Sequence, residues 1–467
     1  MAFLGIDLGT GGVRCLLVEE NGEILGEAGC PLQRLNVATT ERASEQDPVD
    51  WISALESALD DLFSRPGHRN VRAVAVDSTS GTVLPVSDEG DPLGTALLYN
   101  DMRATEEAES CAEVFDGASS PTFSLPKILW MQRHRALPDN CLFLHATDYL
   151  NSWLAGTTAL PTDFTNGMKS GVDLETQDWP AGMPAVRLPG VVAPGRRIGV
   201  LRKDLQTRWQ LAGEVILASG ATDSNAAFYA SGASGPGDWS TTIGTTLAVK
   251  GVSTVKLTDA DARIYCHKHP DGDWLPGGAS NAGGEIVQKR FGSSLKELEV
   301  AALERRTTNH LIYPSIRKGE RLPYASASFA PFFLGPEDDE VGAFLGCVEG
   351  VACVEALVYE LIESLGGTIG DTIFATGGAA RSALSLQLRA DLLQKSLSVP
   401  AHPNSVMGAA VLAAAGFHGD PVGLWSRHLV RIERMVEPDP GRASYFHDRL
   451  GVFREQCERS LGRTGDE

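Results

Sequence analysis

The chain has 467 residues, of which 43% are hydrophobic and 21% charged, and its formal net charge is −20 at pH 7. Because this length is too great for one ordinary core, we expect two domains of about 200 residues or more. The composition is that of an ordinary globular protein. The acidic balance argues against nucleic acid or an anionic membrane as a partner, since either would be bound by a basic face.

The eight cysteines are scattered without a C-x-x-C pair, and we interpret them as reduced thiols. Two histidines in 266–269 would share a face only on a strand, and no second ligand pair accompanies them, so we expect no metal there. The amino terminus has no basic and then apolar leader, and no apolar run reaches the roughly 20 residues of a membrane span. We therefore expect a cytoplasmic protein, monomeric or homodimeric, with no membrane and no nucleic-acid partner.

The first motif is a glycine-rich stretch that directly follows the apolar run 2–4, and it reads Gly5-Ile6-Asp7-Leu8-Gly9-Thr10-Gly11-Gly12. An apolar strand that ends in one carboxylate and a glycine turn brings backbone N–H groups to a phosphate, while Asp7 can hold the accompanying Mg²⁺. Alternating residues resume at 13–18, and 20–23 predicts a hairpin turn, so the loop joins two antiparallel strands. It is therefore neither a Walker loop nor a dinucleotide fingerprint. A plain glycine-rich hairpin with one acidic residue explains the stretch about as well.

A similar piece occurs at 238–251, with a short strand, a Gly-Thr turn and a second strand. Two such hairpins about half a chain apart suggest a duplicated α/β fold that clamps a nucleotide between its halves. The Asp-x-Gly-Thr of the first hairpin, the second Gly-Thr and a later Gly-Gly-Ala at 377–379 resemble the superfamily of sugar kinases, hexokinase, Hsp70 and actin.

Residues 47–65 have capping and proline signals followed by apolar residues at helical spacing, and they predict a helix. A buried strand over 71–76 ends in the small polar residues 77–82, which suit a hydroxylated ligand and a plain turn nearly equally. In 99–104, an aspartate and an arginine two residues apart can bind a polyol bidentately. A helix N-cap with a solvated arginine is the alternative on chemistry alone.

The segment 99–104 resembles the Trp/Tyr-x-Asp-x-Arg segment of the FGGY carbohydrate kinases. Further landmarks of that family follow in its order, and the resemblance runs from about residue 3 to about residue 416. The landmarks are Pro126-Lys127-Ile128-Leu129-Trp130, Asp148-Tyr149-Leu150, Leu154-Ala155-Gly156, Asp163-Phe164-Thr165-Asn166, Asn281-Ala282-Gly283-Gly284, Gly319-Glu320-Arg321-Leu322-Pro323 and Glu349-Gly350-Val351-Ala352.

A strand over 214–220 leads into Asp223, at the start of a helix of small residues, so one carboxylate lies beside a helix N-terminus. An N-cap is the alternative explanation of this aspartate. The resemblance implies that Asp223 is the general base that takes the proton of the attacking sugar hydroxyl. It further implies that the sugar is bound by Ser80, Gly81, Asp101, Arg103, Asp223 and Ser224.

The second half contains a predicted amphipathic helix over 345–367 and a strand over 371–375 that runs into glycines. Glycines between a strand and a helix let the backbone approach a flat or anionic group closely. By resemblance this is the adenosine motif, with Ala379 where many members have a third glycine. The implied ATP ligands are Gly9, Thr10, Gly11, Arg14, Gly244, Thr245, Gly283, Gly284, Gly377, Gly378, Ala379 and Ser382. We expect a closing helix from 405, a surface helix over 446–461 and a frayed tail over 462–467.

These expectations combine into an α/β protein with the two-domain actin-like ATPase fold (ribonuclease H-like), duplicated around a nucleotide cleft. The expected boundaries are 1–235 for the sugar-binding domain that carries the base, 236–436 for the adenosine-binding domain and 437–467 for the helix and tail. ATP and Mg²⁺ are the implied cofactors.

The identity of the sugar depends on 79–81. The xylulokinase branch usually has Met-His-Gly there, whereas this chain has Thr-Ser-Gly and is more similar to the compact pentulose kinases of cyanobacteria and plants. We therefore expect D-ribulose, with D-xylulose second. The alternatives are a kinase of another polyol, and an actin-like or Hsp70-like ATPase or non-catalytic kinase-like regulator. An ATPase that only drives assembly would need neither Asp223 nor the segment 99–103.

Overall fold

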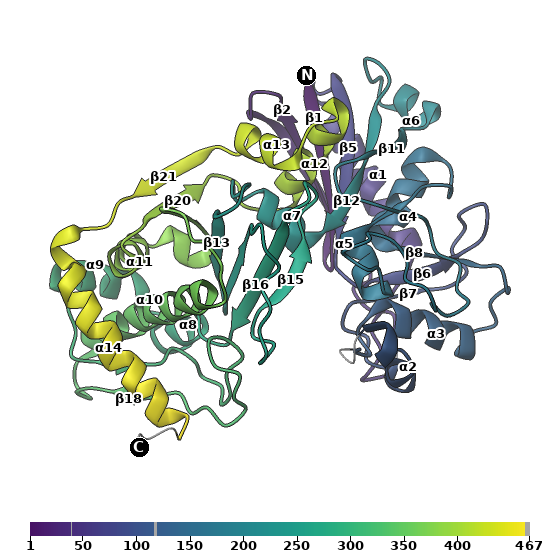
Figure 1. Ribbon diagram of the computed structural model, residues 1–467. Coiled ribbons are helices and arrows are strands. Elements are labelled where there is room, and N and C mark those ends of the chain that lie inside the picture. Colours follow the sequence, from purple (N-terminus) through teal and green to yellow (C-terminus); the bar gives the residue numbers. More distant parts are fainter. Residues whose placement is uncertain (39, 116–118, 463–467) are drawn as a thin grey trace. The chain divides into compact units, whose positions relative to one another are not determined.

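The structure is a computed structural model that describes residues 1–38, 40–115 and 119–462 (Figure 1). The residues group into two compact units, each with more contacts within itself than with the other. The first unit contains Met1–Ala230 and Asn404–Val430, and the second contains Ser231–Pro403 and the chain from Arg431 onward. Each unit is built of helices and a mixed sheet, as the α/β prediction requires.

The central sheet of the first unit has the strand order β11-β12-β5-β1-β2-β3. Its strands are β1 (Ala2–Gly9), β2 (Gly12–Glu19), β3 (Ile24–Pro31), β5 (Val71–Ser78), β11 (Arg197–Val200) and β12 (Ile216–Thr222). β1 and β2 form the antiparallel hairpin predicted from the glycine-rich stretch, whereas β5 is parallel to β1, and β12 is parallel to β5. The carboxyl ends of β1, β5 and β12 therefore meet at one edge of the sheet.

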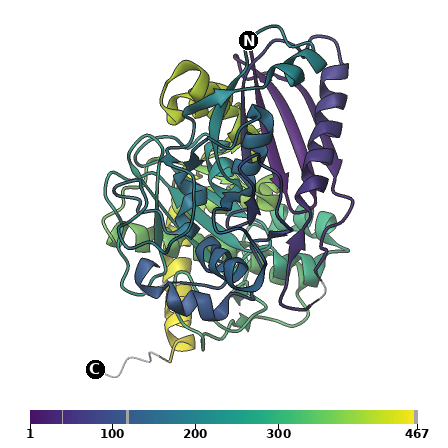
Figure 2. The same cartoon turned by 90° about the vertical axis from the view of Figure 1, so that its right-hand side faces the viewer.

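Helices cover both faces of this sheet. α1 (Pro48–Ser64) packs against β2 and β3, beside which it runs in Figure 2, and α12 (Ser405–His418) packs against β1, β5 and β12. The alternation of a strand sends Leu4 and Ile6 into the core with α1, while Gly5 faces α12. The predicted helix over 47–65 is confirmed, with Asp47 as N-cap through a bond from the Val49 N–H.

The rest of the first unit consists of short elements around this sheet. A small sheet has the order β4-β7-β6-β8, and β9 pairs with β10. Their bounds, with those of the remaining helices, are β4 (Glu45–Gln46), β6 (Val83–Val86), β7 (Ala96–Leu97), α2 (Thr105–Ser110), η1 (Ala112–Phe115), α3 (Ser124–His134), β8 (Leu142–His145), α4 (Ala146–Ala155), β9 (Thr162–Asp163), α5 (Phe164–Gly167), η2 (Met168–Ser170), β10 (Val191–Val192), α6 (Lys203–Arg208), α7 (Asp223–Tyr229) and α13 (Val422–Leu429).

The second unit repeats the plan around a sheet of order β15-β16-β14-β13-β19-β20-β21. Its strands are β13 (Trp239–Ile243), β14 (Leu247–Gly251), β15 (Tyr265–Lys268), β16 (Trp274–Ser280), β19 (Thr372–Thr376), β20 (Ser396–Pro400) and β21 (Ile432–Val436), with β17 (Leu311–Ile312) pairing β18 (Phe333–Leu334) elsewhere. Its helices are α8 (Glu285–Phe291), α9 (Leu295–Arg305), α10 (Glu340–Ser364), η3 (Gly378–Arg381), α11 (Ala383–Leu393), η4 (Pro440–Arg442) and α14 (Ala443–Ser460).

The two units share a core motif. The hairpin β13–β14 has a parallel neighbour, β19, as the hairpin β1–β2 has β5. In the first hairpin Gly9 ends β1 and Thr10 follows it, and in the second Gly244 and Thr245 follow β13. When the two Gly-Thr pairs are aligned, Asp7 in the first unit corresponds to Thr242 in the second. This internal repeat confirms the predicted duplication.

Three segments differ from the sequence-based expectations. α12 belongs to the first unit, whereas the sequence predicted it in the domain over 236–436. The helix packs directly on α7, so closely that a Cβ on Gly408 would stand 1.8 Å from the Ala226 carbonyl oxygen. Residues from 431 onward, including β21 and α14, belong to the second unit rather than to a separate tail. α14 is not merely a surface helix, since Phe446 and Phe453 are buried in the core of that unit. The expected frayed tail lies, apart from Gly462, outside the described residues.

α10 begins five residues before the expected helix and is a core helix rather than an amphipathic one. By length and composition it could cross a membrane, but 94% of its most apolar window is buried inside the protein. The core of the second unit surrounds it with side chains from the sheet and from α8, α9, α11 and α14.

α10 also carries a buried ion pair. Glu355 accepts from the Nε and Nη2 atoms of Arg389 at 2.6 and 2.8 Å, and both side chains are at most 1% exposed. Removing one member of such a pair leaves the other charge buried without compensation, which costs about 3–5 kcal/mol.

We predict that Glu355→Gln lowers the midpoint of urea unfolding far more than Glu360→Gln does. Glu360 lies on the same helix, but its pair with Arg454 is more than 40% exposed on both sides, and such pairs contribute about 1 kcal/mol or less. Fluorescence-monitored unfolding of the two variants measures the difference. Equal shifts would show that the buried pair does not stabilise the second unit.

Candidate active site

Two buried aspartates lie side by side at the carboxyl edge of the first sheet. Asp7, near the end of β1, is 1% exposed, and Asp77, near the end of β5, is 0% exposed. The parallel register places them directly opposite each other. The neighbouring strand β12 ends at Thr222, and Asp223 follows as the first residue of α7. Three carboxylates thus come from three adjacent strand ends.

The two buried aspartates have different surroundings. Asp7 accepts from Arg14, its cross-strand partner on β2, with the guanidinium Nε at 2.7 Å from Oδ2. Asp77 has no hydrogen-bond partner for either carboxylate oxygen in the described part of the chain. Burial, and then the negative charges of Asp7 and Asp223, raise the pKa of Asp77 well above its usual value.

Asp223 is more accessible than the other two carboxylates. Its side chain is half-buried, and its Oδ1 accepts from the N–H of Ser224 at 2.7 Å. The N-cap of α7 is Thr222, so the N-cap explanation of Asp223 is wrong. A carboxylate in the first turn of a helix that is partly open to solvent can meet a substrate hydroxyl.

A lysine lies next to the predicted sugar-contacting loop. The Nζ atom of Lys169, on η2, donates to the backbone oxygen of Ser80 at 3.3 Å, and Gly81 has a left-handed backbone with φ +88°. Partial burial lowers the pKa of Lys169, whereas the charge of Asp223 acts to raise it. Lys127 is almost fully buried beneath the loop and donates to the Gly81 oxygen at 2.5 Å. Burial lowers the pKa of Lys127 to about 7.

The predicted pair Asp101 and Arg103 is joined internally. Asp101 is fully buried, accepts from the N–H of Ser44 at 2.8 Å and accepts from the Arg103 guanidinium at 2.7 to 3.1 Å. Arg103 also pairs with Glu45 and lies 4.3 Å from the ring centre of Trp130. Asp101 therefore orients Arg103, and only the arginine side chain is partly exposed, at 20%.

The glycine-rich turn of the first unit is held by backbone contacts. The carbonyl oxygen of Thr10 accepts from Gln46 at 2.9 Å, and that of Gly11 accepts from the N–H of Leu32 at 3.0 Å. A Cβ on Gly11 would meet no atom of the described residues within 4 Å. With Gly9, this residue forms the loop that the sequence assigns to a phosphate.

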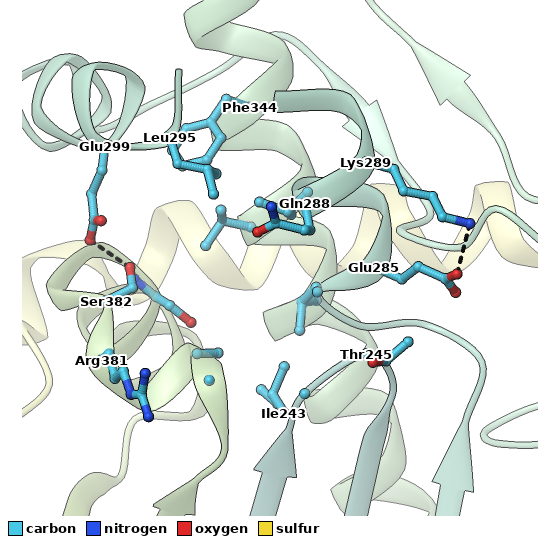
Figure 3. A pocket seen from close by; sticks show the side chains of 18 residues that line it. Ile243, Thr245, Glu285, Gln288, Lys289, Leu295, Glu299, Phe344, Arg381 and Ser382 are labelled. Atoms are coloured by element: carbon cyan, nitrogen blue, oxygen red, sulfur yellow. Dashed lines mark hydrogen bonds and ion pairs between the residues drawn. The ribbon is translucent and has the colours of Figure 1, made fainter. Parts of the chain in front are cut away.

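A cavity of about 650 Å³ lies in the second unit, at the carboxyl ends of β13 and β19 (Figure 3). Of the residues predicted to bind ATP, those that line it are Gly244, Thr245, Gly284, Gly378, Ala379 and Ser382. Gly283 and Gly377 lie behind this lining and permit close packing, since a Cβ on either would stand 2.5 Å from a backbone oxygen. The volume is in the range of small-molecule sites.

The cavity combines an apolar wall with polar groups at its sides. Figure 3 shows Leu295 and Phe344 on one wall, with Gln288 between them and the strand ends. Ser382 donates to Glu299 at 2.6 Å, and Lys289 pairs with Glu285 at 2.9 Å. Apolar surface for a flat ring next to a few fixed polar groups suits a nucleoside.

Several of these residues were missed from the sequence. Gln288 and Glu299 come from α8 and α9, whose composition carries no motif, and Lys169 lies in a single 3₁₀ turn. The sequence does contain an indication of Asp77, because this residue lies near the end of a buried strand as Asp7 does. Across the described residues, no three His, Cys, Asp or Glu side chains converge into an all-protein metal site.

Comparisons with known proteins identify the family of the chain. The model of the FGGY family of carbohydrate kinases, N-terminal domain, matches residues 2–229, and that of the C-terminal domain matches residues 240–417. A xylulose kinase of Staphylococcus epidermidis is 25% identical and covers 99% of this chain and 98% of its own length.

Two solved structures have a similar fold. A xylulose kinase from Brucella ovis has a TM-score of 0.84 at 24% identity, and the glycerol kinase of Plasmodium falciparum with ADP has a TM-score of 0.83 at 16% identity. Each comparison covers 98% of both chains. The two-domain actin-like α/β fold is thereby confirmed, and the chain belongs to the FGGY family of carbohydrate kinases, phosphotransferases that act on an alcohol group with ATP as donor.

Proposed function

We propose that this kinase phosphorylates the terminal hydroxyl of a ketopentose. The observation that carries the proposal is the position of Asp223, half open at the carboxyl edge of the first sheet where Asp7 and Asp77 are buried, in a chain that both FGGY domain models match. Phosphoryl transfer needs a placed hydroxyl, a proton acceptor and compensation of phosphate charge. The described side chains offer a candidate for each.

In the proposal, the cavity of the second unit takes the adenosine part of ATP. In the first unit, the turn 9–11 offers backbone N–H groups that can bind phosphate. Asp7 fits Mg²⁺, because Arg14 contacts only its Oδ2 atom and leaves Oδ1 for a cation. The ion would neutralise charge on the phosphates.

Asp223 accepts the proton of the attacking hydroxyl. The sugar that accepts the phosphoryl group would lie against Ser80, Gly81 and Ser224. Arg103, held by Asp101, offers hydrogen-bond donors to a sugar oxygen. Lys169 supplies a positive charge close to both Ser80 and Asp223, where the transferred phosphoryl group would bring negative charge.

Asp223→Asn should lower kcat by about 10²- to 10⁴-fold, because the amide keeps the shape of the side chain but cannot take the proton. Binding of a fluorescent ADP analogue should change little, since the adenosine cavity lies in the other unit. Circular dichroism of the same preparation checks the fold. A folded Asp223→Asn protein with wild-type turnover would exclude Asp223 as the base.

Gly378→Leu should abolish binding of the fluorescent ADP analogue while the protein stays folded. The nearest atom to a Cβ at Gly378 is 4.0 Å away, so the new side chain has room to enter the cavity and fill it. Gly451→Leu is the control, because it adds the same side chain in the same unit at an open position outside the cavity lining. Retained nucleotide affinity in Gly378→Leu would place the adenosine elsewhere.

The choice of sugar has two candidates. The Thr-Ser-Gly at 79–81 favours D-ribulose, and the similarity to a xylulose kinase favours D-xylulose. ADP release should be compared for both ketopentoses, for gluconate and for glycerol, with kcat/KM as the measure. Highest kcat/KM for gluconate or glycerol would refute the ketopentose assignment while leaving the kinase activity in place.

Ser80 should affect binding of the sugar more than the chemical step. It would touch the sugar in the ground state as well as the transition state, so Ser80→Ala should mainly raise KM. Ser80→His should disfavour D-ribulose more than D-xylulose. Unchanged kinetics with both sugars in both variants would show that this position does not select the pentulose.

A further inference from the structure

Asp77 is a buried carboxylate for which the proposed reaction has no use. It is 0% exposed, and neither of its oxygens has a hydrogen-bond partner in the described parts of the chain. Its neighbour across the parallel register is Asp7, also buried. Burying polar groups without partners is unfavourable, and two adjacent carboxylates repel each other. Arg14 compensates the charge of Asp7, whereas the charge of Asp77 would be compensated by a proton or a cation between the two carboxylates.

The second unit has a different pair of side chains at the corresponding position. Thr242 corresponds to Asp7, and Thr376 is its parallel partner on β19 as Asp77 is on β5. The two threonine hydroxyls hydrogen-bond each other at 2.6 Å. The fold thus accepts a neutral, self-satisfied pair at these strand ends, and the carboxylate pair of the first unit is not a requirement of the backbone.

The Asp7 and Asp77 side chains share the face of the sheet that α12 covers. Both lie on the same side because directly paired residues of neighbouring strands point the same way. Arg14 contacts Oδ2 of Asp7, so its two bonds do not occupy Oδ1. A Cβ on Gly9 would stand 4.0 Å from Oδ2 of Asp7, and the glycine keeps that side uncrowded.

We propose that Asp77 is a second protein ligand of the divalent cation, so that Asp7 and Asp77 bind it together from adjacent strand ends. This inference rests on the proposed placement of Mg²⁺ at Asp7. Mg²⁺ is commonly held by one or two carboxylates, with waters and substrate phosphates completing its shell, and two carboxylates therefore suffice. Asp223 remains outside the pair and keeps its role as proton acceptor.

Mn²⁺ tests the inference, because it prefers the same oxygen ligands and its free concentration can be read from its electron paramagnetic resonance signal. The whole protein is titrated with Mn²⁺ alone, and the Kd for Mn²⁺ should rise at least about 10-fold in Asp77→Asn. This is the lower end of the loss of metal affinity seen when a residue that only hydrogen-bonds a metal ligand is removed. Asp7→Asn should weaken binding at least as much. Glu89→Gln removes an exposed negative charge from the same unit and should change the Kd less than twofold.

Asp77→Thr provides a second variant in case the asparagine protein does not fold, since Thr376 shows that the corresponding position accommodates threonine. If Asp77→Asn and Asp77→Thr both bind Mn²⁺ as the wild type does while Asp7→Asn does not, Asp77 is a structural carboxylic acid and the inference fails. If Asp7→Asn also binds normally, the placement of the metal at Asp7 fails with it. Sugar phosphorylation by the wild type is measured separately and is independent of either outcome.

Discussion

Helix α12 approaches the first sheet so closely that backbone contacts backbone. A Cβ on Gly5 would stand 2.0 Å from the carbonyl oxygen of Val406, and one on Gly408 would stand 1.8 Å from that of Ala226. Through these two glycines one helix fixes β1, which carries Asp7, and α7, which carries Asp223. It also packs against β5, which carries Asp77. The relative positions of the three carboxylates therefore depend on a helix that begins 182 residues after the last of them.

The internal repeat explains how one core motif can serve two purposes. Each unit has a hairpin, a Gly-Thr turn and a parallel neighbouring strand. In the first unit the strand ends carry carboxylates, and the cationic side chains of Arg14 and Lys169 lie near them. This combination suits the binding of a metal ion and phosphate and the transfer of a proton. In the second unit they carry threonines and open into a partly apolar cavity, which suits a flat ring. The division of chemistry follows from side chains, because the backbones are alike.

Much of this could be predicted from the sequence, where local signals and spacing are strong. Both hairpins, α1 with its Asp47 cap and the strand before Asp223 follow from glycines, capping residues and alternation, whereas six lining residues of the cavity were implied by the resemblance to the FGGY kinases. The unit to which α12 belongs could not be predicted, because its small residues reveal a tight contact but not its partner. Lys169 and Gln288 were not predicted either, since each depends on a fold contact that no local motif records.

Asp77 is the instructive intermediate case. The sequence places it at the end of a buried strand, but only the register with β1 shows that it faces Asp7, and only the threonine pair of the second unit shows that a carboxylate is not needed there. Likewise, Asp101 was expected to bind sugar, and the structure shows its oxygens already accepting from Arg103 and Ser44. Side-chain partners, which a sequence does not display, distinguish a supporting carboxylate from a reactive one.

The central claim is that phosphoryl transfer ends on the terminal hydroxyl of a ketopentose. It is tested most directly by nuclear magnetic resonance of the products formed from ATP, Mg²⁺ and ¹³C-labelled D-ribulose or D-xylulose. The account predicts ADP and a phosphate monoester in equal amounts, with phosphorus coupled to the terminal carbon of the sugar. Inorganic phosphate without a sugar ester, or an ester on another carbon, would contradict it.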